Sequence, residues 1–120
     1  MKNAGENFNL NKEALLSELS NLNGKYHSDK VLYVSDGSDG DRYAIIALNW
    51  QWEENIYPRL AIRWFHGKYG FPHNGQNASW FIIPPSFNDY VLEMLQEKGM
   101  DSNKIDSIKA FLSEKPTILR

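Results

Sequence analysis

The sequence predicts a single α+β domain in which helices pack on one face of an antiparallel sheet. The 120 residues match the length of one domain, and 42% of them are apolar, which is enough for one core. Apolar residues recur with helical spacing near both ends of the chain and with strand spacing between them. The expected links between strands are too short for parallel crossovers, so the strands should pair antiparallel.

The first expected element is a helix over residues 12–23. Leu15, Leu16, Leu19 and Leu22 fall on one stripe, and Gly24 follows them where a helix commonly ends. Residues 1–9 are polar, so we expect a loose terminus there, followed by a single domain over residues 10–120.

Four strands are expected, at about residues 31–35, 42–52, 59–66 and 79–83. The second strand is apolar on both faces for most of its length, which predicts a central position in the sheet. Its Trp50 and Trp52 fall on one face and its Asn49 and Gln51 on the other. The pair Glu53-Glu54 is expected to be a solvated hairpin tip.

The third strand is expected to have one buried face and one outer face. Leu60, Ile62 and Trp64 alternate with Arg59, Arg63 and Phe65, so the arginines and Phe65 share the outer face. Pro58 should begin or precede this strand, because proline cannot donate to a ladder.

Two helices should follow, over residues 86–98 and 102–114. Ser86 is expected to cap the first, with Asp89 three positions on in capping-box spacing, and Gly99 to end it. Pro116 should stop the second. The three helices are expected to pack on one face of the sheet.

Several classes of function find no support in the sequence. The chain has no cysteine, which excludes disulfides, thiolate zinc sites and cysteine nucleophiles. Phosphate-binding loops and the nucleophile elbow are missing, and His66 and His73 lack the spacing of a zinc-binding helix. We therefore expect no enzyme, no metal and no cofactor. No apolar run approaches the roughly 20 residues of a membrane span, and no signal peptide is recognisable, so a cytoplasmic location without membrane association is expected.

The distribution of charge is the most informative feature. The whole chain has a net charge of -2, yet residues 55–88 contain no Asp or Glu and carry Arg59, Arg63 and Lys68. The same segment is rich in aromatic rings: Tyr57, Trp64, Phe65, Tyr69, Phe71, Trp80, Phe81 and Phe87. Cations that meet phosphates and rings that stack on bases suit single-stranded nucleic acid.

The rings of this segment divide between core and contact surface. Trp64 shares a face with Leu60 and Ile62, so we expect it in the core. Phe65 shares a face with the arginines and is the better candidate for a displayed ring. The predicted contact residues are Arg59, Arg63, Phe65, His66, Lys68, Tyr69 and Trp50.

Residues 42–95 resemble the small transcriptional-coactivator family, related to the Whirly proteins, that binds single-stranded DNA. The residues that carry the resemblance are Ile62-Arg63-Trp64 at a strand end, the loop Gly67-Lys68-Tyr69-Gly70, the strand Trp80-Phe81-Ile82-Ile83 and the helix start at Ser86. Leu48-Asn49-Trp50 matches the preceding strand. The resemblance implies a dimer with single-stranded nucleic acid across the strands, contacted by Arg63, Lys68 and Trp50.

The sequence thus predicts a small non-enzymatic binding module for single-stranded nucleic acid. The alternative is a protein-interaction domain, such as a bacterial inhibitor or immunity-type protein, that uses the same aromatic loop as its contact surface. An enzyme acting through His66 or His73 is the weakest alternative. A homodimer is compatible with the exposed edge of an open sheet.

Overall fold

The computed structural model describes residues 25–35, 40, 42–65, 71, 73–74, 77–78 and 80–118. The elements in chain order are β1 (Lys25–Val34), β2 (Tyr43–Trp52), β3 (Asn55–Trp64), β4 (His73–Asn74), β5 (Asn77–Ala78), β6 (Phe81–Ile82), the 3-10 helix η2 (Pro85–Phe87), α2 (Asn88–Glu97), α3 (Ser102–Leu112) and β7 (Thr117–Ile118). The predicted terminus at 1–9 and helix at 12–23 lie outside the described residues.

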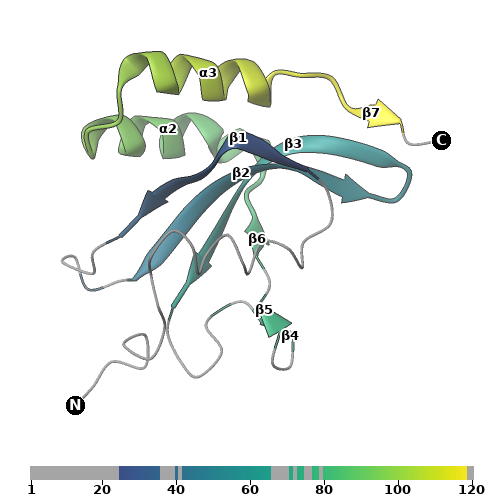
Figure 1. The fold of residues 1–120 in the computed structure, drawn as a ribbon, viewed down its shortest axis with the longest axis horizontal. Coiled ribbons are helices and arrows are strands. Elements are labelled where there is room, and N and C mark those ends of the chain that lie inside the picture. Colours follow the sequence, from purple (N-terminus) through teal and green to yellow (C-terminus); the bar gives the residue numbers. More distant parts are fainter. Residues whose placement is uncertain are drawn as a thin grey trace.

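The main sheet is antiparallel throughout its described pairs. β1, β2, β3 and β6 are neighbours in that order, and β7 pairs with the start of β3. Because β2 occupies one edge of β3 along its whole length, β6 and β7 share the other edge. The predictions of an antiparallel α+β fold and of a central second strand are confirmed (Figure 1).

Several strand boundaries differ from the prediction. β1 begins six residues before the expected start at residue 31, and β3 begins at Asn55 rather than at 59. The last expected strand, over 79–83, is reduced to Phe81–Ile82. The short hairpin of β4 and β5 and the C-terminal β7 were not predicted, because strands of two residues carry no readable alternation.

Pro58 lies inside β3, which corrects the expectation that it begins or precedes the strand. On the side of β3 away from β2, the Ile83 N–H donates to the Leu60 carbonyl (2.8 Å) and the Trp64 N–H donates to the Phe71 carbonyl (2.7 Å). Backbone groups of successive strand residues turn to alternate sides, so the nitrogen of Pro58 also faces away from β2. The β2–β3 ladder therefore loses no hydrogen bond to the proline.

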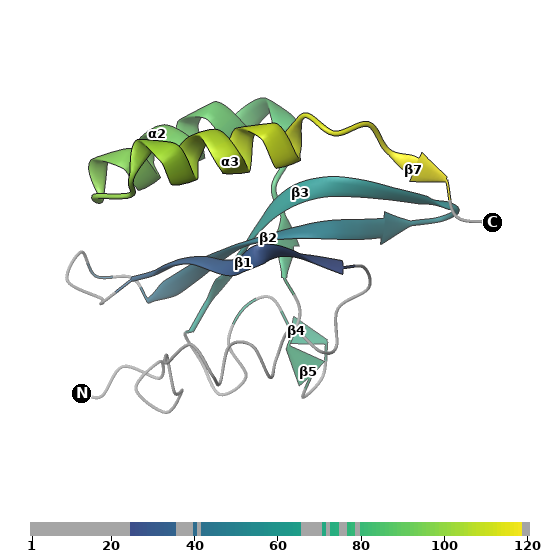
Figure 2. The ribbon, with the colours of Figure 1, turned by 45° about the horizontal axis from the view of Figure 1, so that its top comes forward.

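The helices α2 and α3 form a layer over one face of the sheet, as the sequence predicts (Figure 2). Their buried side chains meet those of the strands in one apolar cluster. The sheet and its flank contribute Leu32, Tyr43, Ile45, Ala47, Leu60 and Ile83, and the helices contribute Leu92, Leu95, Ile105, Ile108 and Phe111. Trp64 packs against this cluster while half-buried, in agreement with its predicted core position.

The ends of α2 differ in how well the sequence predicts them. The expected Ser86 cap is wrong: Ser86 lies in the 3-10 turn η2, and α2 begins at Asn88 without a side-chain cap. The predicted end at Gly99 is confirmed, since its φ is +102°. The Gly99 N–H donates to the Gln96 carbonyl and the Met100 N–H to the Leu95 carbonyl, both at 3.0 Å, which is the Schellman pattern.

The other face of the sheet is also buried at its centre. Its apolar cluster consists of Val31, Ala44, Ile46, Leu48, Ala61, Phe65 and Trp80. The sheet is therefore covered on both faces there, which corrects the expectation that the arginine-bearing face of β3 is an outer surface. No helix of the described part of the chain is long and apolar enough to cross a membrane.

Candidate binding site: the β2–β3 hairpin

Half-buried and exposed aromatic side chains gather where β2 turns into β3. The turn residues Glu53 and Glu54 are exposed, which confirms the predicted hairpin tip. Trp50 lies opposite Tyr57 in the antiparallel register, and Leu48 lies opposite Arg59. Residues that lie opposite each other on paired strands share a face of the sheet, and so do alternate residues of one strand. Leu48 belongs to the cluster on the face away from the helices, so Trp50, Trp52, Tyr57 and Arg59 lie on that face too.

These four side chains contact one another in a row. The rings of Trp50 and Trp52 stack with centroids 5.4 Å apart and an interplanar angle of 25°. Trp50 also meets Tyr57 at 6.4 Å, and the guanidinium carbon of Arg59 lies 5.0 Å from the Tyr57 ring centroid. We call Trp50, Trp52, Tyr57 and Arg59 the hairpin patch.

The hairpin patch combines order with exposure. Trp50, Tyr57 and Arg59 are half-buried, whereas 56% of the Trp52 surface is exposed. The Arg59 Nη1 donates to the Pro58 carbonyl oxygen at 2.8 Å, which holds the guanidinium over Tyr57. A half-exposed indole in a stacked row offers a large, rigid apolar surface to a partner at little cost in conformational entropy.

Two of the predicted contact residues are buried instead. Arg63 and Phe65 are each only 1% exposed, and the guanidinium carbon of Arg63 lies 5.6 Å from the Phe65 ring centroid. The expectation of a displayed Phe65 ring is therefore wrong. The alternation along β3 was predicted correctly, but this face continues into the second apolar cluster rather than into solvent.

The remaining predicted contact residues separate into two groups. Trp50 and Arg59 come together in the hairpin patch, whereas His66, Lys68 and Tyr69 lie outside the described residues. Trp52 and Tyr57 were not among the predicted contacts. The signal for Trp52 is present in the sequence, because Trp50 and Trp52 are two residues apart on the expected second strand. Tyr57 joins them through a two-residue turn that its Glu-Glu sequence does not indicate.

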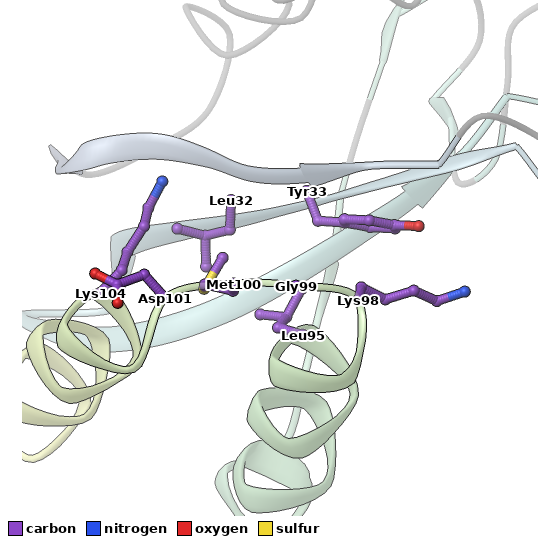
Figure 3. Close-up of a pocket in the computed structure, with 8 residues that line it drawn as sticks. All are labelled: Leu32, Tyr33, Leu95, Lys98, Gly99, Met100, Asp101 and Lys104. Carbon is purple, nitrogen blue, oxygen red and sulfur yellow. The ribbon is translucent and has the colours of Figure 1, made fainter.

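A cavity of about 330 Å³ lies between β1 and the turn that joins α2 to α3 (Figure 3). Leu32, Leu95 and Met100 supply its apolar wall, and Lys98 and Lys104 lie at its two ends. Within the described part of the chain, no group of three or more His, Asp or Glu side chains is arranged to hold a metal ion.

Comparison with models of known protein families, with curated proteins and with solved structures finds no match to this chain. The resemblance to the single-stranded-DNA-binding coactivators consequently stays a prediction. Among the described residues, the hairpin patch joins four side chains through three consecutive ring and cation–π contacts.

Proposed function

We propose that this chain is a non-enzymatic interaction module that docks another protein on the hairpin patch. The observation that supports the proposal most strongly is the exposed Trp52 ring, stacked on Trp50 in a row that continues to Tyr57 and Arg59. Trp, Tyr and Arg are the residue types that contribute most to binding energy at protein interfaces. Their arrangement on a paired hairpin gives the surface a defined shape before a partner arrives.

The charges around the patch favour a protein over a nucleic acid. Arg59 is the cation of the patch, and it is already engaged with Tyr57 and the Pro58 carbonyl. Glu53 and Glu54 are exposed at the adjoining turn and repel phosphates. Arg63, the cation on which the nucleic-acid prediction relied most, is buried.

The proposal is tested by affinity capture from the cells that produce the protein. Three chains are immobilised separately: the wild type, Trp52→Ser and Tyr90→Ser. Tyr90→Ser is the matched control because Tyr90 is 71% exposed but lies on the helix layer. We expect at least one protein to be retained by the wild type and by Tyr90→Ser but lost from Trp52→Ser. If every retained protein binds all three chains equally, the hairpin patch is not the docking surface.

Binding of single-stranded nucleic acid is the second candidate. The Trp50–Trp52 stack favours it, because a base can extend a row of stacked rings and each such contact contributes roughly 1–3 kcal/mol. Fluorescence anisotropy with labelled oligo-dT and a matched duplex, at low and moderate salt, separates the two candidates. Binding of the single strand that weakens as salt rises would favour nucleic acid, whereas no binding at low salt would exclude it, since electrostatic attraction is strongest there.

A further inference from the structure

One face of the Trp52 indole is available for another group. Trp50 stacks against Trp52 with a centroid separation of 5.4 Å, while 56% of the Trp52 surface stays exposed. The indole face carries negative electrostatic potential and is the best of the aromatic side chains at attracting a cation. The hairpin patch already contains one such contact, between the Arg59 guanidinium and the Tyr57 ring.

The charges nearest to Trp52 in the chain are negative. Glu53 and Glu54 follow it directly, and both are exposed in the turn. Arg59 lies at the opposite end of the patch from Trp52. It pairs with Leu48, two residues farther from the turn than the pair Trp50–Tyr57. At the Trp52 end of the patch, an exposed indole is thus followed in the chain by two exposed acidic residues.

The backbone at Glu53 gives a second reason to consider this end of the hairpin. Its φ is +56°, the one positive value among the described non-glycine residues. Tight hairpin turns strongly prefer Gly, Asn or Asp at such a position, because a Cβ atom strains the backbone at positive φ and only the short polar side chains of Asn and Asp offset this by local hydrogen bonds. A glutamate here keeps an acidic residue next to Trp52 in the chain in spite of this strain, and strained residues tend to occur where a site needs them.

We propose that the partner contributes an arginine side chain that lies on the open face of Trp52 and is neutralised by Glu53 and Glu54. A guanidinium suits both contacts, because it is planar enough to stack on the ring and its N–H groups can still donate to carboxylates at its edge. The inference rests on the proposed function and names the chemistry of the partner that the hairpin patch binds. Complementarity of charge selects a basic protein segment over an acidic or a purely apolar one.

The test uses the full chain labelled with nitrogen-15 and follows its indole N–H signals by NMR. The chain has four tryptophans, and Trp52→Phe assigns the signal of interest by its disappearance. The probe is the peptide acetyl-Gly-Arg-Gly-Arg-Gly-amide. Its control is the same peptide with citrulline in place of arginine, which keeps the shape and removes the charge. We expect the arginine peptide to shift the Trp52 signal in a saturable way, and the citrulline peptide to leave it in place.

Two variants then separate the ring from the carboxylates. Trp52→Leu should weaken binding of the arginine peptide about tenfold, and the double variant Glu53→Gln with Glu54→Gln about threefold. Glu93→Gln, an exposed carboxylate on α2, is the matched control and should leave the affinity unchanged. Urea midpoints of all variants, compared with the wild type, establish that each remains folded.

Equal shifts with both peptides, or an affinity that does not respond to the two glutamine substitutions, would overturn the inference. A tighter, salt-sensitive shift of the same signal by oligo-dT would also overturn it and assign the patch to nucleic acid. A different result would refute the proposed function: the wild type and Trp52→Ser would capture the same proteins. A partner that is lost from Trp52→Ser, but that the arginine peptide does not displace from the wild type, would support the docking surface. The same result would refute the proposal that the partner binds through an arginine.

Discussion

Truncation of Phe65 to alanine tests whether the arginine-bearing face of β3 is core or contact surface. Phe65 is 1% exposed, so the substitution removes a fully buried ring and also uncovers the buried Arg63 guanidinium 5.6 Å away. Loss of a buried phenylalanine ring costs about 3–5 kcal/mol, including the cavity left behind. We therefore expect the free energy of unfolding to fall by about 4 kcal/mol, a large part of the roughly 5–15 kcal/mol that a domain has.

Urea denaturation followed by tryptophan fluorescence measures this loss. With a urea dependence of about 2 kcal/mol per molar, the midpoint should fall by about 2 M. Phe81→Ala is the matched control: it removes the same ring from neighbouring β6, where 51% of it is exposed, and should shift the midpoint by at most about 0.5 M. Small and equal shifts in the two variants would show that Phe65 is exposed and would refute the two-sided core.

Three further predictions concern the turns and the helix-covered core. Glu53→Gly should raise the free energy of unfolding by about 0.5–1 kcal/mol in urea denaturation, because glycine accepts the φ of +56° without strain; a lower stability would contradict the turn geometry. Gly99→Ala should lower the free energy of unfolding by about 1 kcal/mol in the same assay, because the φ of +102° strains alanine even though an added Cβ meets no atom within 4 Å. An unchanged midpoint would count against the Schellman end of α2. Leu60→Ala, at a fully buried position beneath the helices, should lower the thermal midpoint by an amount equivalent to about 2–5 kcal/mol, and a change below about 1 kcal/mol would mean that the helices do not pack there.

Much of the fold could be predicted because its periodicities are distinct. The apolar run in β2 predicted a central strand, and Gly99 predicted the end of α2. The boundaries were less predictable where pairing rather than local preference decides them. The early residues of β1 form a strand by pairing with β2 at Asn49 and Leu48, and Pro58 is accepted because its nitrogen faces away from β2.

The candidate site was predictable only in part. Alternation correctly separates Trp64 from Arg63 and Phe65, but a period of two does not indicate which face of a sheet lies open to solvent. Here both faces are covered at the centre, and at the hairpin end Trp50 packs against the rim of the second buried cluster while Trp52 is exposed. The spacing of the two tryptophans contained part of this information, whereas Arg63, the cation on which the prediction relied most, lies in the core.

The most direct test of the central claim is the affinity of the purified, captured partner for three chains, measured by isothermal titration calorimetry. Trp52→Ser should weaken binding at least about thirtyfold relative to wild type, as expected for an interface residue that contributes about 2 kcal/mol or more. Tyr90→Ser, which changes an even more exposed ring on the helix layer, should bind as the wild type does. If the two serine variants bind with the same affinity as each other, the hairpin patch is not the binding surface of this protein.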